Sequence, residues 1–138
     1  NFLTTIQKLA QTRKQIKVVD DQTGTPTSAR AIAESTTHIL GQGLNAGTTK
    51  SSIFSHPGIF HISCGGETNW FGFAKTILNL SGLSEGTEVT PIPTSEYPTL
   101  ATRPKYSLLS NKKLKQVFHY EMPSWQHALQ ECLGSAPK

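Results

Sequence analysis

The ten residues from Val18 to Thr27 constrain the fold more than any other part of the chain. Their sequence is VVDDQTGTPT. The two β-branched residues predict the end of a strand, and Gly24 and Pro26 predict a tight turn. A helix-like stretch follows the turn at once. A segment of this kind can place polar side chains such as Gln22 and bare backbone groups at the lip of a cleft.

The apolar pattern around this segment predicts a mixed α/β fold. Helical spacing predicts helices over residues 2–14, from a cap at 27 or 28 to about 40, from a cap at 68 or 69 to 80, over 111–117, and from a cap at 124 onward. Strands are predicted over residues 15–20, 58–63 and 88–93, and loops over 43–57 and 94–107. Gly41 and Gly43 are expected to stop the second helix, and Gly82 the third. Pro91 and Pro93 place the last strand at a sheet edge.

Composition narrows the class of partner. The chain has 138 residues and a formal net charge of +4, which suit one globular domain with a real core. The five basic residues of the acid-free stretch 97–120 form one positive patch, and they are Arg103, Lys105, Lys112, Lys113 and Lys115. Such a patch suits an anionic small molecule. No nucleic-acid-binding motif is present, so we expect no nucleic-acid partner.

The cellular setting follows from two further observations. No apolar run approaches the roughly 20 residues that cross a bilayer, so no membrane association is expected. Cys64 and Cys132 lack CxxC spacing and a second pair, which favours free thiols in a reducing cytoplasm. The start at Asn1 has neither an initiator Met nor a signal pattern, so we expect a piece of a longer protein.

The sequence supplies no complete reaction centre. It contains no GxGxxG, no GxxxxGK[ST] and no GxSxG motif, and its histidines show no metal-ligand spacing. A Tyr general acid with a Lys four residues on would suit carbonyl reduction, because the Lys charge lowers the pKa of the phenol. None of Tyr97, Tyr106 and Tyr120 has that Lys. We therefore expect no catalytic, cofactor-binding or metal-binding residue in this chain.

Four ordered blocks over nearly the whole chain resemble the C-terminal half of the dTDP-4-dehydrorhamnose reductases, which are extended short-chain dehydrogenases/reductases. The blocks are Asn1-Phe2 with Leu9-Ala10; Val18–Thr27, similar to VVDDQxGxPT; Gly58-Ile59-Phe60-His61 with Trp70 and Phe73-Ala74; and Glu96-Tyr97-Pro98-Thr99 with Arg103-Pro104, Ser107–Leu109 and Pro123-Ser124-Trp125. Any one block alone is weak. Their order and coverage make the resemblance specific.

The resemblance implies the substrate-binding part of a reductase with a Rossmann-like, NAD(P)-binding parent fold. Residues 1–138 would be this C-terminal part, with 1–20 open to assignment to the Rossmann core. The family reduces the C4 ketone of dTDP-4-dehydro-L-rhamnose to dTDP-L-rhamnose for cell-surface polysaccharide. NADPH or NADH and the catalytic Tyr and Lys belong to its N-terminal half, so this chain alone would be inactive.

Two other readings stay open: a non-catalytic relative of the reductases and, as the weaker one, a free-standing basic adaptor domain, which strong nucleic-acid binding at moderate salt would support. A regulatory subunit of methionine adenosyltransferase also resembles these reductases, so the chain is alternatively a non-catalytic binding relative. The upstream sequence would discriminate the two, because an intact Tyr-x-x-x-Lys favours the enzyme. An apolar face left by the missing half predicts self-association or a homodimer.

The resemblance assigns the dTDP-sugar to five residues of this chain, which are Arg103, Gln22, Thr27, Asn1 and Lys105. An arginine offers a planar fork to a diphosphate, and a primary amide offers two donors and an acceptor. Each of the five also has a structural alternative. Arg103 and Lys105 could be solvated surface residues, and Gln22 could bond its local backbone in a turn. Thr27 could be only a helix cap, and Asn1 a frayed chain end. Thr102 stands where the family often has a second arginine.

Two pairs of residues are expected to be structural. Trp70 and Trp125 at helix starts are predicted core anchors, with a stacking surface for thymine as the alternative. Asp20 and Asp21 invite reading as an acid/base pair. Adjacent strand residues point to opposite faces, however, so we do not expect the two carboxylates to converge on one substrate.

Overall fold

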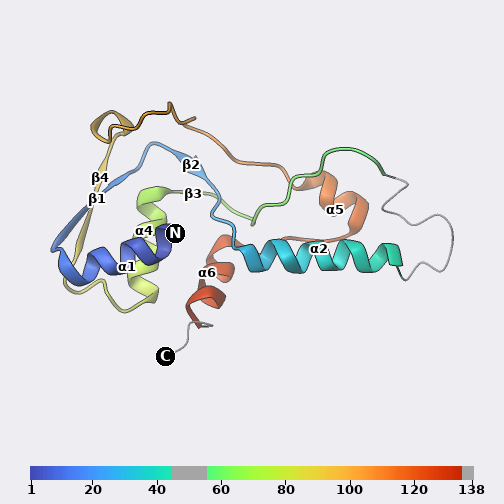
Figure 1. The fold of residues 1–138 in the computed structure, drawn as a ribbon, viewed down its shortest axis with the longest axis horizontal. Coiled ribbons are helices and arrows are strands. Elements are labelled where there is room, and N and C mark those ends of the chain that lie inside the picture. The colour runs from blue at the N-terminus through green and yellow to red at the C-terminus, as the bar shows by residue number, and fades with distance from the viewer. Residues whose placement is uncertain (45–55, 135–138) are drawn as a thin grey trace.

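The computed structural model describes residues 1–44 and 56–134 and confirms the mixed α/β prediction. The elements in chain order are α1 (Phe2–Thr12), β1 (Gln15–Val19), β2 (Thr23–Gly24), α2 (Ala29–Leu44), β3 (Thr68–Asn69), α4 (Trp70–Leu80), β4 (Glu88–Ile92), the 3-10 turn η1 (Thr94–Glu96), α5 (Lys112–Phe118) and α6 (Trp125–Gly134). The molecule is elongated, with β1, β4, α1 and α4 towards one end and α2 with α5 towards the other (Figure 1).

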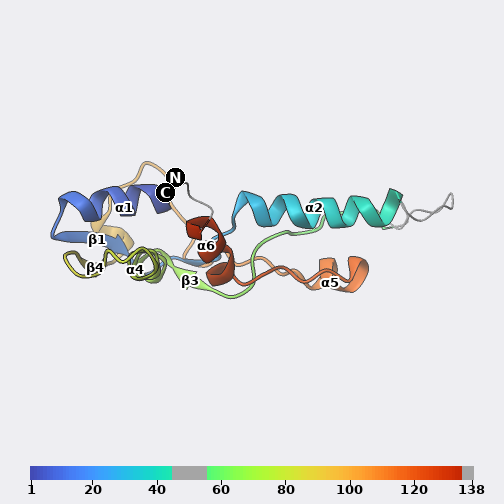
Figure 2. The ribbon, with the colours of Figure 1, turned by 90° about the horizontal axis from the view of Figure 1, so that it is seen from below.

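The first end is a small layered body. β1 and β4 pair in parallel, with Ile16 opposite Val89 and Val18 opposite Pro91. α4 packs on both strands, and α1 packs on β1 and α4 (Figure 2). Pro91 is tolerated because β4 has β1 as its one strand partner within the described residues, as the edge prediction requires. Two side-chain bonds tie α1 to the rest, since Gln7 Nε2 donates to Ser81 Oγ and Thr87 Oγ1 to the Ala10 carbonyl.

The core of the chain joins this body to α6. Its buried side chains are Ile6, Ile16, Val18, Ala31, Cys64, Ala74, Ile77, Leu78, Leu114, Phe118, Met122, Trp125, Ala128 and Leu129. The buried residues of α4 are Ala74, Ile77 and Leu78. Trp125 is also buried, at 5% exposed, whereas Trp70 is 42% exposed. The prediction of a core anchor is therefore confirmed for Trp125 and wrong for Trp70.

The second helix is longer than predicted. It continues through Gly41 to Leu44 rather than stopping near Leu40, because side chains of its last turns hold it against the α5 region. Gln42 Nε2 donates to the Phe118 carbonyl at 2.9 Å. The rings of His38 and Tyr120 also lie 4.8 Å apart. Of the loop predicted over 43–57, residues 43 and 44 belong to this helix and 45–55 lie outside the described residues.

The strand predicted over residues 58–63 is wrong. The segment has no ladder partner in the described chain, because side chains take its backbone groups instead. Asn111 Nδ2 donates to the Ser63 carbonyl at 2.6 Å, and Asn111 Oδ1 accepts from the Ser63 N–H. Lys113 Nζ donates to the Ile59 carbonyl. The β-rich composition thus produces an extended segment pinned to α5, not a strand.

Helix ends follow the local sequence closely. Asn69 Oδ1 accepts from the Gly72 N–H at 2.7 Å and caps α4, and Ser124 Oγ accepts from the His127 N–H in α6. The α4 helix ends as predicted at Gly82, with φ of 65°, where the Leu83 N–H bonds the Leu78 carbonyl. Of the two caps proposed for α2, Ser28 is the one whose hydroxyl accepts from the Ala31 N–H.

None of the helices in the described chain is long and apolar enough to cross a membrane. Cys64 is buried and Cys132 is exposed, and both are free thiols, as the spacing predicted. Burial raises the pKa of the Cys64 thiol above its usual range.

Candidate functional site

Three segments meet along the main chain of Thr23, in the middle of the VVDDQTGTPT motif. β2 pairs antiparallel with β3, which places Thr23 opposite Asn69 and Gly24 opposite Thr68. On its other side, the Thr23 N–H donates to the Lys105 carbonyl at 2.8 Å, and the Thr23 carbonyl accepts from the Ser107 N–H at 3.0 Å. This narrow pairing brings the helix start at 69–70 and the loop at 103–107 to the same place.

Gly24 suits this close approach. A Cβ on Gly24 would lie 2.9 Å from Ser107 Oγ, so the Ser107 hydroxyl would have to move away from its bond to the Thr23 carbonyl. The glycine therefore allows the 103–107 loop to lie against β2. Asn69 adds a further tie, because its Nδ2 donates to the Asp20 carbonyl at 2.7 Å while its Oδ1 caps α4.

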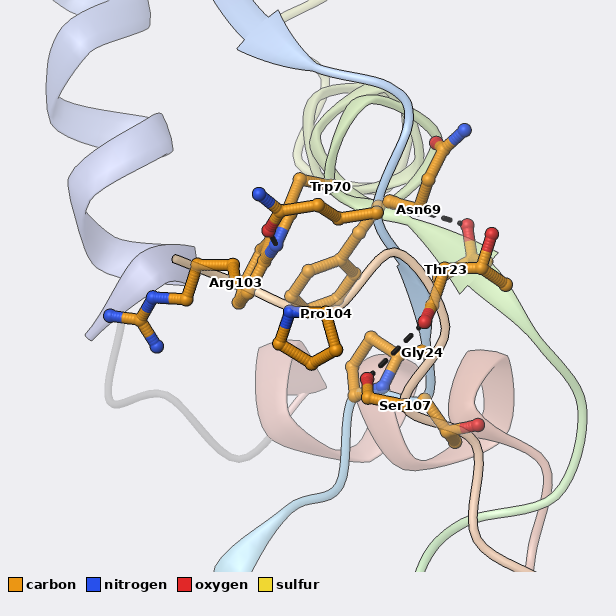
Figure 3. A pocket seen from close by; sticks show the side chains of 12 residues that line it. Thr23, Gly24, Asn69, Trp70, Arg103, Pro104 and Ser107 are labelled. Carbon is orange, nitrogen blue, oxygen red and sulfur yellow. Dashed lines mark hydrogen bonds between the residues drawn. The ribbon is translucent and has the colours of Figure 1, made fainter. Parts of the chain in front are cut away.

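A cleft of about 270 Å³ lies beside this junction (Figure 3). Its lining residues are Gln22, Thr23, Gly24, Thr25, Pro26, Thr68, Asn69, Trp70, Phe73, Arg103, Pro104 and Ser107. Aromatic and proline rings provide apolar walls, and amide, hydroxyl and guanidinium groups provide polar contacts. A mainly apolar cleft with a few convergent polar groups is typical of a small-molecule site.

Gln22 and Arg103 are the two predicted ligand residues that line the cleft. The amide of Gln22 already has partners far away in the sequence: its Oε1 accepts from Trp70 Nε1 at 3.2 Å, and its Nε2 donates to Thr94 Oγ1 at 3.0 Å. Gln22 is therefore not a turn residue that bonds its local backbone.

Arg103 lies on the exposed loop at the side of the cleft, and its guanidinium points away from the other labelled side chains (Figure 3). The ion pairs found within the described residues join Arg30 to Glu34, Lys115 to Glu121 and His127 to Glu131, and none involves Arg103. An exposed, unpaired guanidinium can bind an incoming anion without first losing a carboxylate partner.

The other three predicted ligand residues do not line the cleft. Thr27 Oγ1 accepts from the Cys64 N–H at 3.1 Å and bonds the Thr25 carbonyl, which fastens the motif to residue 64. Asn1 caps α1, because its Oδ1 accepts from the Thr4 N–H at 3.0 Å. Lys105 contributes its carbonyl to the pairing with Thr23, and its side chain is exposed.

Asp21 bonds Thr94, which in turn accepts a hydrogen bond from the Gln22 amide. Its Oδ1 accepts from both the N–H and the hydroxyl of Thr94. The Thr94 hydroxyl bond, helped by the Thr94 N–H and the nearby Lys105 charge, lowers the pKa of the Asp21 carboxyl. Asp21 is thus ionised at neutral pH and has a structural role, as the sequence indicated.

The polar lining of the cleft consists of amide, hydroxyl and guanidinium groups. The described residues contain no group of three or more His, Cys, Asp and Glu side chains that could hold a metal ion. The Gly65–Gly66 turn, which precedes β3 and α4, makes its backbone contacts with neighbouring residues of the chain. The Gly65 N–H donates to the Pro123 carbonyl, and Gly66 lies against the Trp125 ring.

Sequence reasoning did not single out several of the lining residues as candidate ligand contacts, and these are Thr68, Asn69, Phe73, Pro104 and Ser107. It also missed Thr94, which links Asp21 to Gln22 across more than 70 positions of sequence. For Trp70 the alternative to a core anchor was a stacking surface, and its place in the cleft wall favours that alternative. A Trp that starts a helix after a polar cap is compatible with both the core and a cleft wall.

The RmlD substrate binding domain model matches residues 1–137, so the chain belongs to this family. It is 39% identical over 139 residues to a dTDP-4-dehydrorhamnose reductase of Burkholderia thailandensis, covering 96% of this chain and 46% of that protein. It is 35% identical over 134 residues to the spore coat polysaccharide biosynthesis protein SpsK of Bacillus subtilis, covering 96% of this chain and 41% of that protein. The chain thus spans less than half the length of these relatives.

Solved structures agree with the family assignment. A dTDP-4-dehydrorhamnose reductase from Bacillus anthracis, solved in complex with NADP, superposes with a TM-score of 0.84 at 29% identity, over 99% of this chain and 43% of that one. The corresponding protein of Clostridium acetobutylicum gives a TM-score of 0.82 at 34% identity, over 97% and 43%. The predicted fold, the C-terminal part of an extended short-chain dehydrogenase/reductase, is confirmed.

Proposed function

We propose that this chain is the substrate-binding part of a dTDP-4-dehydrorhamnose reductase and that its cleft holds the dTDP-sugar. The observation that carries the proposal is the junction at Thr23, which gathers Gln22 and the unpaired Arg103 in one cleft of a substrate-binding family. Arg103 would bind the diphosphate, with Lys105 adding positive potential. Thr27 and Asn1 would act indirectly, by holding the motif and the start of α1.

The whole reaction would transfer a hydride to the C4 carbonyl carbon of dTDP-4-dehydro-L-rhamnose and a proton to its oxygen, giving dTDP-L-rhamnose. NADP in the Bacillus anthracis structure supports NADPH as the hydride source. The Gly65–Gly66 turn offers no open backbone to a dinucleotide phosphate, because the Gly65 N–H is bonded to the Pro123 carbonyl and Trp125 lies against Gly66. NADPH and its Tyr and Lys would thus belong to another part of the protein, with residues 1–20 adjoining it.

The names of the relatives favour a reductase over a non-catalytic regulatory protein. We also propose that the reaction is a cytoplasmic step towards a cell-surface polysaccharide, and the name of SpsK, a spore coat polysaccharide biosynthesis protein, supports the polysaccharide part. We further propose that the exposed apolar side chains of the 97–109 loop are covered by another part of the protein or by a second copy. They are Tyr97, Leu100, Tyr106 and Leu109, with 49% or more of each exposed.

The test uses the protein as expressed from its native gene and follows NADPH oxidation with dTDP-4-dehydrorhamnose. Arg103→Ala is expected to lower kcat/KM roughly 10- to 100-fold, mainly through KM, because a charge-assisted contact to the diphosphate forms in both substrate and transition state. Lys112→Ala is the matched control, since it removes the same charge from an exposed position outside the cleft.

Two outcomes would count against the proposal. Absence of NADPH oxidation by the wild-type protein would contradict the proposed reductase activity. Equal kcat/KM for Arg103→Ala and Lys112→Ala would contradict the proposed diphosphate role of Arg103 and indicate only a general effect of charge.

A further inference from the structure

Trp70 presents an unusually open aromatic surface to the cleft. It is the first residue of α4 and lines the cleft with Phe73 and Arg103 (Figure 3). Its exposed fraction is 42%, against 5% for Trp125 at the same position of α6. An indole in the wall of a small-molecule cleft can stack with a planar group of a ligand, whereas an indole buried in the core cannot.

Protein packing holds the indole from one side. The Phe2 ring lies 4.8 Å from the Trp70 ring at an interplanar angle of 51°, and it stacks on Phe73 at 5.5 Å. Both distances are in the range of favourable aromatic pairs. The Trp70 ring is therefore packed against α1 through Phe2, which itself stacks on Phe73, while part of the indole stays exposed.

A directed chain of hydrogen bonds fixes the edge of the ring. An ionised carboxylate only accepts, so Asp21 takes the hydroxyl proton of Thr94. The Thr94 oxygen then accepts from Gln22 Nε2 at 3.0 Å, which leaves Gln22 Oε1 to accept from Trp70 Nε1 at 3.2 Å. Each bond sets the direction of the next, so the Gln22 amide has one orientation and the indole N–H one acceptor.

We propose that Trp70 is the stacking surface for the pyrimidine ring of the nucleotide, and that Asp21, Thr94 and Gln22 are positioning residues for it. The inference rests on the proposed function, because it places the base and the diphosphate of one ligand in one cleft, at Trp70 and at Arg103. Every nucleobase has a π-face, so stacking on Trp70 supplies affinity for the pyrimidine whatever polar groups its edge carries. Gln22 fixes the plane of the indole.

The test measures dissociation constants of dTDP and of inorganic pyrophosphate for the protein as expressed from its native gene, by calorimetry. Trp70→Ala is expected to weaken dTDP binding roughly 5- to 150-fold and to leave pyrophosphate binding unchanged, because pyrophosphate has no base. Arg103→Ala is expected to weaken both ligands. Lys112→Ala is expected to weaken neither beyond a general charge effect.

The positioning residues have their own readout. Thr94→Val removes the hydroxyl that joins Asp21 to Gln22 and is expected to weaken dTDP about 3-fold or more and to shift the Trp70 indole N–H resonance. Thr94→Ser keeps the hydroxyl and is expected to restore both. Loss of affinity that Thr94→Ser does not restore would overturn the positioning role.

A measurement on the unmutated protein guards against variants that fail to fold. Nuclear Overhauser effects between the thymine methyl group and the Trp70 indole protons, assigned with Trp70→Phe, are expected in the dTDP complex. Wild-type protein that binds dTDP with no such effects, or a Trp70→Ala protein that binds dTDP as wild type does, would overturn the stacking assignment alone. Wild-type protein that binds no dTDP would overturn the proposed function as well.

Discussion

The two tryptophans of the chain follow the same local pattern and have opposite environments. Each is the first residue of a helix and follows a polar cap, Asn69 for Trp70 and Ser124 for Trp125. Trp125 is buried at the centre of the core, and Trp70 lies half open in the cleft wall. Phe73 meets the Trp125 ring edge-on at 5.9 Å and the Phe2 ring face-on, and Phe2 in turn lies against Trp70.

The hydrogen bonds of the two indoles reverse the expectation from burial. The buried Trp125 Nε1 has no acceptor within the described residues, whereas the more exposed Trp70 Nε1 is bonded to Gln22. In the core, the packing of the Trp125 ring offsets the cost of an N–H without an acceptor. In the cleft, a chain of polar side chains orients the Trp70 ring. The comparison separates residues that stabilise the fold from residues that prepare the site.

The largest expected effect is on stability. Trp125→Ala should lower the free energy of unfolding by about 3–5 kcal/mol, because a large buried ring leaves a cavity. Trp70→Ala should cost less than about 2 kcal/mol, since much of that ring is already in water. Urea unfolding of both variants measures the difference. Equal losses would mean that the two rings do not belong to different regions.

Trp125→Phe is a finer test of the same region. It keeps an aromatic ring in the core and removes the unsatisfied Nε1, so the two effects oppose each other. We expect a loss in the free energy of unfolding of less than about 1.5 kcal/mol. A loss as large as that of Trp125→Ala would indicate that the indole N–H has a partner that stabilises the fold.

The two caps should differ by a smaller amount. Ser124→Ala removes one hydrogen bond to the helix backbone and should cost about 1 kcal/mol in the free energy of unfolding. Asn69→Ala should cost more, because Asn69 also donates to the Asp20 carbonyl. Thermal unfolding monitored by circular dichroism compares them. If Ser124→Ala is the more destabilising, the cleft junction contributes less to folding than its bonds indicate.

The smallest expected effect is a pH dependence at the site. The bond from Thr94 lowers the pKa of Asp21 in the folded protein, so the stabilisation from Asp21 is complete above the unfolded value of about 4. It should be lost as pH falls through the lower folded value. The difference in unfolding free energy between wild type and Asp21→Asn should therefore shrink from pH 5 to pH 2. A difference that grows would show that the sign of the shift is wrong.

Local features of the fold were predictable and distant ones were not. The cap at Asn69 and the stop at Gly82 depend on neighbours within one helical turn, so the sequence states them. The strand predicted over residues 58–63 failed because its backbone partners are side-chain atoms of Asn111, some 48 positions away. α2 passed its glycines because Gln42 is bonded to Phe118.

The candidate site shows the same limit. Gln22 and Arg103 were singled out through the family resemblance, and nothing in either local pattern says that they share a cleft. Their proximity arises from the pairing of Thr23 with Lys105 and Ser107, and Gly24 leaves room for the Ser107 side chain. Trp70 could not be told from Trp125 by sequence, because the identity of the residues that cover a ring is a property of the folded chain.

The most direct test of the cleft as the nucleotide site is an amide NMR titration of this 138-residue chain with dTDP. Dispersed resonances with shifts centred on Gln22–Thr25, Trp70 and Arg103 are predicted, with α2 and α5 unaffected. Dispersed resonances that do not respond to dTDP, or shifts confined to α2 and α5, would contradict the assignment of this cleft to the dTDP-sugar.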